Sequence, residues 1–281
     1  MSAGKRPGRT LCTMKEKAPT QEETEKMTEK KTLQNIVETL ERRREDFTEL
    51  KAEMTRRFGP KKDDEIFRAL PKPQPLDVPL KTVLMNRRSE RSFSDEPITD
   101  YDLSTLLNAV DGINRPNGKR TTPSCLNWRE IEVYVLKSNG IWRWVPERNG
   151  LLFLSIRDVR EETGFGQPAI LAAPVELVYV ANFQKTRGRM TMLGEKIIEL
   201  FNDDWDDEAA EDIRRRAADL NAGAKVQMAY LAAAALHLST VVRLGFDPER
   251  LGRALHLGPD EKVVAVQSLG YRPSSIFDHI R

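Results

Sequence analysis

The hydrophobic pattern separates a helical N-terminal part from a longer part that mixes strands and helices. Large apolar residues recur every seven positions between residues 32 and 58, from Leu33 to Met54, which predicts one apolar stripe along a helix. Residues 1–31 contain few large apolar side chains and are expected to be disordered. The expected organisation is a tail over 1–31, a helix with a Pro-rich connector over 32–79, and one domain over 80–281.

Helix and strand patterns alternate within this domain. Thr99 and Asp102 have the spacing of a helix N-cap, which opens a helix over 100–110. An Ala-rich helix is expected over 217–238, either buried in the core or at a dimer interface. The Asn-Gly pair at 139–140 predicts that the first two strands form a hairpin. The predicted strands cover residues 132–136, 141–145, 175–181, 240–244 and 263–269.

An irregular segment lies before the Ala-rich helix. Apolar side chains crowd residues 190–205, and an acidic run follows at 203–208. Consecutive carboxylates lack the alternate spacing and glycine of a calcium loop, and they are typical of a helix N-terminus. Residues 184–212 are therefore interpreted either as a helical lid over an active site or as a helix packed on the domain surface.

Composition and charge are those of a soluble protein with a basic arm. The chain has 281 residues, of which 39% are hydrophobic and 31% charged. Residues 1–62 hold 16 Lys and Arg against 11 Asp and Glu, whereas the remainder holds 29 against 32. Because the arm mixes both charges and lacks interleaved aromatic residues, we expect no nucleic-acid partner, and we expect a helix that is solvated or binds a protein partner.

No membrane attachment or disulfide framework is expected. No apolar run approaches the length of a membrane span, and the basic start is not followed by an apolar signal core. The two cysteines, Cys12 and Cys125, have no metal-binding spacing. The three histidines are scattered, which favours structural over catalytic roles, and we expect no metal site. These features favour a reducing, cytoplasmic location.

Three arginines and two serines gather over residues 87–93, directly after an expected helix. Arginine is planar and permanently charged, so the Arg-x-Ser-x-Arg arrangement can give a phosphate dianion several charge-assisted hydrogen bonds. The alternative is a solvated basic face. A second polar cluster, over residues 119–128, favours the phosphate interpretation.

The order of these and later motifs resembles the nitroreductase family of FMN enzymes over roughly residues 80–273. The resemblance rests on residues 87–93, 112–115, 120–127, 173–180, 238–243 and 267–271. It implies an α+β fold with a central, mainly antiparallel sheet flanked by helices, in an interlocked homodimer with FMN at the subunit interface.

The resemblance also implies binding residues. The phosphate and ribityl contacts of the family correspond here to Arg87, Arg88, Ser89 and Arg91. The segment that edges the flavin ring corresponds to Pro123, Ser124 and Asn127. The loop whose backbone donates to flavin N5 corresponds to Arg243, Leu244 and Gly245.

Three positions depart from the family pattern. Arg129 stands where the family commonly has Gln, and it is either a cation near the flavin ring edge or a solvent-facing side chain. Leu244 stands where many relatives have Glu, which removes an acid beside the reacting atom. Met228 replaces a frequent Asn and, like Gln227, is equally consistent with a packing position.

The resemblance implies hydride transfer from NAD(P)H through FMN to a nitroaromatic, quinone or related small acceptor. Two alternatives remain at this point. One is a flavin-dependent dehydrogenase of a modified peptide, as in the thiazole/oxazole-dehydrogenase-like branch of the family. The other is a non-catalytic interaction protein on the same fold, in which the N-terminal helix carries the function.

Overall fold

A computed structural model describes residues 66–165, 172–186 and 207–273 of the chain. The predicted tail and the predicted helix over 32–58 lie outside the described residues, as do residues 187–206 of the interpreted lid.

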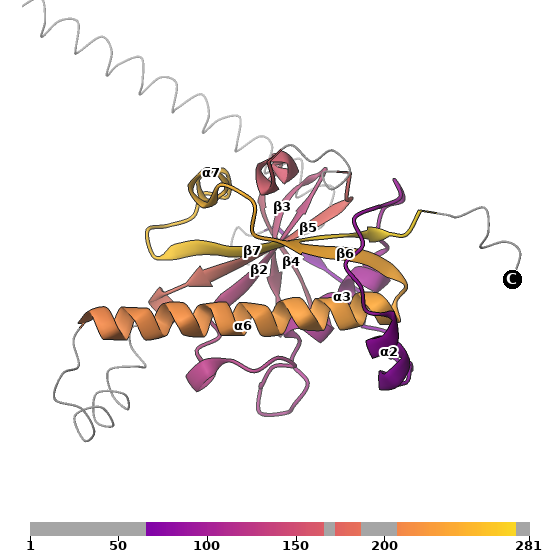
Figure 1. The fold of residues 1–281 in the computed structure, drawn as a ribbon, viewed down its shortest axis with the longest axis horizontal. Coiled ribbons are helices and arrows are strands. Elements are labelled where there is room, and N and C mark those ends of the chain that lie inside the picture. Colours follow the sequence, from indigo (N-terminus) through magenta and orange to yellow (C-terminus); the bar gives the residue numbers. More distant parts are fainter. Residues whose placement is uncertain (1–65, 166–171, 187–206, 274–281) are drawn as a thin grey trace, which may run out of the picture. The chain divides into compact units, whose positions relative to one another are not determined.

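A seven-stranded sheet forms the centre of the described domain (Figure 1). Its order is β1-β4-β3-β2-β5-β7-β6, and each adjacent pair is antiparallel, so the expected antiparallel sheet is confirmed. The strands are β1 Phe67–Ala69, β2 Ile131–Lys137, β3 Gly140–Val145, β4 Gly150–Ser155, β5 Val175–Asn182, β6 Leu238–Arg243 and β7 Glu261–Tyr271.

The predicted hairpin is confirmed, with its turn one residue earlier than the Asn-Gly pair. Lys137 pairs with Gly140, which leaves Ser138 and Asn139 as the two-residue loop. Gly140 has φ +133°, and a Cβ there would lie 2.3 Å from the backbone oxygen of Ser155. Glycine is therefore required at the start of β3 rather than inside the turn.

Four α-helices are described: α2 Leu80–Asn86, α3 Asp100–Asp111, α6 Asp207–Ala235 and α7 Pro248–Ala254. The predicted N-cap of α3 is confirmed, because the Asp102 amide donates to the Thr99 hydroxyl at 3.1 Å.

The prediction that the Ala-rich helix begins at 217 is wrong by ten residues. Residues 207–212, interpreted as part of a lid, belong to α6.

The helices cover both faces of the sheet. α6 contacts α2, α3 and strands β2, β6 and β7, whereas α7 packs on β7 from the opposite side (Figure 1). Small residues on α6 allow its backbone to approach the domain closely; Ala218, Ala222, Ala229 and Ala233 are buried. The face of α6 away from the sheet exposes Leu220, so the helix belongs to the core on one side only.

Part of the Pro-rich connector is packed on the domain. The Ser104 hydroxyl donates to the backbone oxygen of Pro71 at 2.5 Å, and the Gln74 amide donates to the Thr105 hydroxyl at 2.9 Å. β1 adds to the sheet just before this point and was not predicted from the sequence. Within the described ranges, no helix combines the length and the apolar character needed to span a membrane.

Candidate functional site

The arginine segment, defined as residues 87–93, leaves α2 and runs along β6. Arg87 is the C-cap residue of α2. The Glu90 amide donates to the backbone oxygen of Thr240 at 3.0 Å, and the Glu90 carboxylate accepts from the Ser239 hydroxyl at 3.0 Å. These two bonds fix the segment against the outer strand of the sheet.

Tyr230, a buried residue of α6, anchors the same segment from the helix side. Its hydroxyl lies 2.9 Å from the Ser89 hydroxyl and accepts from the Val242 amide, also at 2.9 Å. The Arg87 guanidinium lies 5.4 Å from the centre of the Tyr230 ring, in the range of a cation–π contact. A single hydroxyl therefore connects the arginine segment to the end of β6.

The arginines of this segment present unneutralised charge. Arg87 is half-buried, whereas Arg88 and Arg91 are exposed. No carboxylate in the described part of the chain lies within ion-pair distance of Arg87 or Arg91, and Arg88 is 3.8 Å from Glu90. Guanidinium and hydroxyl donors in this spacing fit a phosphate dianion.

The strained loop, defined as residues 124–130, carries the second group of predicted residues. Leu126, Asn127 and Arg129 have φ values of +48°, +57° and +57°, a region that non-glycine residues rarely occupy. Such strain persists only where surrounding contacts impose the conformation, and it is common at ligand sites.

Hydrogen bonds to α6 impose this conformation. The Ser124 hydroxyl accepts from the Arg129 amide at 2.9 Å and donates to the Glu130 carboxylate at 3.3 Å. The Asn221 side chain donates to Glu130 at 2.6 Å and accepts from the Cys125 amide at 3.1 Å. Because Glu130 and Asn221 are buried, these bonds close a ring that fixes the loop on the helix.

A buried ion pair supports the residues that precede this loop. The Lys225 ammonium of α6 contacts the Asp111 carboxylate at the end of α3. Arg120 lies 3.4 Å from Asp111 and 2.5 Å from Glu147. Burial lowers the pKa of Lys225, and the charge of Asp111 opposes that shift.

The third predicted group, at the end of β6, has a buried polar base. The Arg243 guanidinium donates to the Glu176 carboxylate at 2.7 Å, to the backbone oxygen of Thr163 at 2.6 Å and to the Ser268 hydroxyl at 3.0 Å. Glu176 is fully buried. Burial raises the pKa of Glu176 to about 7, although Arg243 and Ser268 favour its charged form.

Exposed apolar side chains surround the backbone that follows Arg243. Leu244 is 73% exposed, and Phe165 is 70% exposed. Among the described residues, a Cβ on Gly245 would meet only the Phe165 ring, at 4.0 Å. The absence of a side chain at Gly245 leaves space for a flat ring to approach the backbone.

The structure therefore brings two of the three predicted groups together. Tyr230 joins the arginine segment to β6, and residues 243–245 continue from the end of that strand. The strained loop is anchored at Asn221, nine residues earlier on α6, which corresponds to about 14 Å along the helix axis.

The sequence did not point to the residues that hold these segments. Glu176 interrupts an otherwise apolar strand, and Asn221 and Lys225 are one turn apart on an Ala-rich helix. A single polar residue in such a context is a signal for a buried hydrogen-bond partner. Tyr230 gave no comparable signal, because a tyrosine on an apolar helix face is usual in a core.

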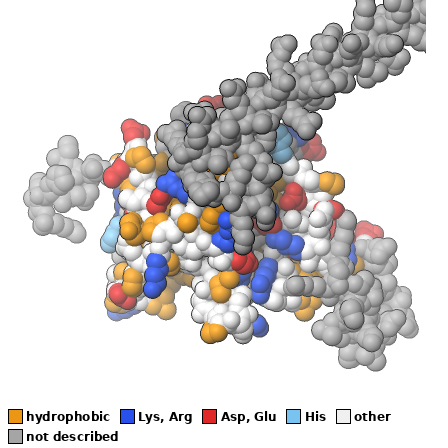
Figure 2. All heavy atoms as spheres, turned by 180° about the vertical axis from the view of Figure 1, so that it is seen from behind, with side chains coloured by type: hydrophobic (Ala, Val, Ile, Leu, Met, Phe, Trp, Pro, Cys, Tyr) orange, Lys and Arg blue, Asp and Glu red, His pale blue; other side chains and the backbone are white. Residues whose placement is uncertain are grey.

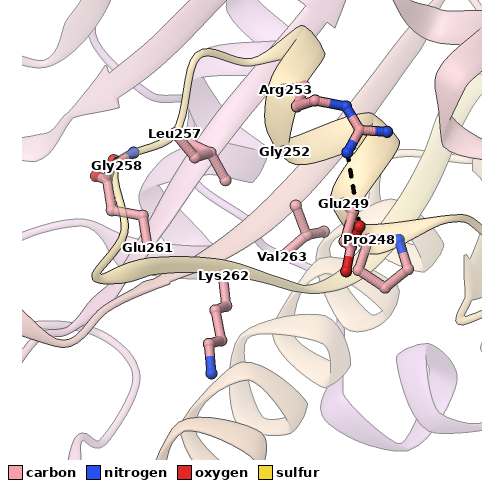
Figure 3. A pocket seen from close by; sticks show the side chains of 9 residues that line it. All are labelled: Pro248, Glu249, Gly252, Arg253, Leu257, Gly258, Glu261, Lys262 and Val263. Carbon is pink, nitrogen blue, oxygen red and sulfur yellow. Dashed lines mark hydrogen bonds and ion pairs between the residues drawn. The ribbon is translucent and has the colours of Figure 1, made fainter.

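A groove of about 420 Å³ lies between α7 and the start of β7 (Figure 3). It is bordered by an ion pair of Arg253 and Glu249, with Leu257 and Val263 on its apolar side. None of the predicted binding residues lines this groove, so it is separate from the three groups.

The domain surface shows no single sign of charge on the face drawn in Figure 2, where basic, acidic and apolar side chains of the described residues are interspersed. Among the described residues, no group of three His, Cys, Asp or Glu side chains has the arrangement of a metal site.

Comparison with known proteins identifies the relatives of this chain. The chain is 31% identical to a structure described as a nitroreductase of Ralstonia eutropha, with a TM-score of 0.61 over 74% of this chain and 90% of that one. It is 29% identical over 119 residues to a protein of Methanocaldococcus jannaschii described as a nitroreductase. That match covers 39% of this chain and spans 60% of the archaeal protein.

A more distant structure shares the fold. The Escherichia coli microcin synthetase McbBCD complex with truncated pro-MccB17 bound matches 72% of this chain and 75% of that one, at 17% identity and a TM-score of 0.52.

The model of the nitroreductase family matches residues 84–271, which is most of the described domain. The chain therefore belongs to the nitroreductase family.

Proposed function

We propose that this chain is an FMN-dependent oxidoreductase that takes a hydride from NAD(P)H and delivers it to a nitroaromatic, quinone or related small acceptor. Members of its family are typically oxidoreductases and commonly bind FMN. The observation that carries the proposal is the Tyr230 hydroxyl, which contacts both Ser89 and the Val242 amide. It holds a set of phosphate donors beside a strand end that is open to a flat ring.

The residues present fit FMN in their chemistry. Arg87, Ser89 and Arg91 would bind the phosphate and the ribityl chain. The charges of the two guanidiniums are not neutralised by described carboxylates, and the Ser89 hydroxyl adds a neutral hydrogen-bond donor. The backbone at Leu244–Gly245 would approach the ring, since a Cβ at Gly245 meets no atom of the described residues closer than 4.0 Å. Pro123 and its neighbours in the strained loop would edge the ring at the subunit interface.

When bound, FMN would supply the hydride chemistry. The side chains described here would bind and orient, and none is required as a general acid or base. Leu244 and Phe165 would exclude water from the reacting face, because both are large, apolar and exposed beside Gly245. Arg129 donates to Asn127 at 3.1 Å and would place a cation near the ring edge.

A homodimer is part of this proposal. Three apolar side chains on α2 are exposed: Leu80 by 65%, Leu84 by 55% and Met85 by 76%. Leu220 on α6 is 67% exposed, and α2 contacts α6. Apolar side chains gathered on neighbouring helices are typical of an interaction surface.

The test is the absorption spectrum of the purified, desalted protein, followed by anaerobic addition of NADH and then NADPH. We expect a flavin spectrum that either reductant bleaches and that a quinone or nitroarene restores. A colourless protein that takes up no added FMN would contradict the proposal. Oxygen-dependent oxidation of a peptide without consumption of NAD(P)H would instead favour a peptide dehydrogenase.

A further inference from the structure

A buried carboxyl–guanidinium pair joins two loops beside the proposed flavin site. The Arg243 guanidinium reaches from the end of β6 to Thr163, where it binds both the backbone oxygen and, at 3.1 Å, the hydroxyl. Glu176 on β5 and Ser268 on β7 complete the cluster, with the Ser268 hydroxyl 2.9 Å from Glu176. The Arg243 side chain is 10% exposed and that of Glu176 is 0% exposed.

The cluster is poorly explained as a device for stability alone. Ionised pairs lose solvation on burial, and well-packed apolar residues are often at least as stabilising. The neighbours of Glu176 on β5, Val175 and Leu177, are apolar and buried. Among the described residues the buried Arg243 Nε also has no hydrogen-bond partner, which adds to the cost.

What the cluster does is fix the relative position of two short segments. Arg243 is the last residue of β6, and Leu244–Gly245 follows it directly. On the other side, a Cβ at Gly164 would lie 2.5 Å from Arg243 Nη1, so the Thr163–Phe165 backbone lies against the guanidinium. The Phe165 ring in turn lies beside Gly245.

We propose that Glu176 and Arg243 are positioning residues of the flavin site, which hold the Leu244–Gly245 backbone and the Thr163–Phe165 loop in one geometry toward the flavin ring. This inference rests on the proposed function. Their side chains act through the loops, because the Arg243 guanidinium is engaged by Thr163, Glu176 and Ser268. Fixed backbone dipoles near a flavin ring change the relative stability of its oxidised and reduced forms, so the pair contributes to the flavin potential.

The first measurement is amide hydrogen exchange on the full chain, with and without FMN. The Phe246 amide donates to the backbone oxygen of Leu244 at 3.1 Å, and the Glu162 amide donates to that of Val159 at 3.0 Å, so each reports on one loop. In Glu176→Gln we expect both amides to exchange about tenfold faster, because a charge-assisted contact is lost. Unchanged exchange at both amides would overturn the inference.

The second measurement is the midpoint potential of bound FMN. A tenfold change in the relative affinity for oxidised and reduced flavin corresponds to about 30 mV for a two-electron couple, and we expect a shift of this size in Glu176→Gln. Faster exchange with an unchanged potential would show that the pair holds the loops without any role toward the flavin, which also overturns the inference.

A matched control separates positioning from general destabilisation. The Tyr179 hydroxyl, also buried on β5, donates to Gln267 on β7 at 2.8 Å, and among the described residues no hydrogen bond joins it to either loop. Tyr179→Phe removes a buried hydrogen bond from the same sheet, and we expect it to lower the melting temperature while leaving the potential and both reporter amides unchanged. A potential that shifts equally in Tyr179→Phe would contradict a specific role for the pair.

A double variant makes the same distinction in reverse. Glu176→Leu with Arg243→Met replaces the pair by apolar side chains, which recovers stability but not the contacts to Thr163. We expect the melting temperature to recover while the potential shift and the fast exchange remain. Recovery of the melting temperature, the potential and the exchange rates would show that the pair serves stability alone.

A wild-type chain that binds no FMN would contradict the proposed function itself, and with it the flavin role of the pair. The exchange data would still report whether the two loops are joined.

Discussion

The arginine segment and the strained loop are built in opposite ways, although both were predicted to contact the same cofactor. In the arginine segment Arg88 and Arg91 are exposed, Arg87 and Arg91 have no described ion-pair partner, and the backbone keeps ordinary conformations. The strained loop places three non-glycine residues at positive φ and is held by the buried side chains of Glu130 and Asn221. Charged side chains suit a phosphate, whereas a fixed backbone suits a flat ring, so substitutions in the two regions should separate binding from stability.

The largest expected effect is on cofactor affinity. Arg87→Ala with Arg91→Ala removes two charge-assisted contacts, and we expect the dissociation constant for FMN to rise about a thousandfold. The melting temperature should change little, because neither side chain has a described ion pair and the cation–π contact of Arg87 with Tyr230 is the one described contact of these two guanidiniums that is lost. Titration of the apoprotein with FMN measures the affinity.

The matched control is Arg157→Ala with Arg253→Ala, which removes two exposed guanidiniums outside the arginine segment. Its FMN affinity should remain near that of the wild type. Equal losses in both double variants would show that only net charge matters.

Substitutions that release the strained loop should lower the free energy of unfolding more than they lower the affinity for FMN. Asn221→Ala leaves the buried Glu130 carboxylate without its 2.6 Å donor, and we expect a loss of about 3 kcal/mol in the free energy of unfolding. Asp219→Ala, an exposed change on the same helix, should stay within about 0.5 kcal/mol of the wild type. Denaturant unfolding measures both, and similar values for the two variants would contradict the anchoring role of Asn221.

A smaller effect is expected from pH. Burial raises the pKa of Glu176 from 4.5 to about 7, so the folded state holds that proton more tightly than the unfolded state. The resulting stabilisation is fully present below about pH 4.5 and is lost as the pH rises through 7. Arg243 and Arg160 are the cations that face this carboxyl, and their charge favours its ionised form.

Over this window we expect the free energy of unfolding of the wild type to carry a decline on the order of 2 kcal/mol that Glu176→Gln lacks. Urea unfolding at several pH values between 4.5 and 8 measures it. If the free energy of unfolding declined equally with pH in both proteins, a group other than Glu176 would be the one that titrates.

The smallest effect concerns the proposed dimer. Met85→Glu puts a charge on the exposed face of α2, and we expect the dimer dissociation constant to rise about tenfold. Ile156→Glu, at an exposed apolar position outside α2 and α6, is the control. Sedimentation equilibrium measures both, and a dimer that is insensitive to Met85→Glu but weakened by the control would move the interface away from α2.

Much of the fold could be predicted because its signals are local. The N-cap at Thr99, the hairpin around Ser138 and the strand over 175–182 each depend on a few consecutive residues. The start of α6 could not be placed from its alanines, because the acidic residues that begin the helix also fit a loop. β1 was missed because three residues carry too little pattern.

The sequence predicted the residues of the candidate site that would contact the cofactor, but not the buried residues that hold them. A resemblance identifies Arg87 or Ser124 by position, but it does not show what holds them. Tyr230 lies 141 residues from Ser89 in the chain, and Asn221 lies 96 residues from Cys125. Contacts of such separation depend on the completed fold, so the buried polar residues that set the geometry emerge only from the structure.

The most direct measurement is a crystal structure of the full chain grown with excess FMN. The account predicts the flavin phosphate within hydrogen-bonding distance of Arg87, Ser89 and Arg91, with the ring against the backbone of Gly245. Guanidiniums that point into solvent, with side chains filling the space beside Gly245, would contradict it.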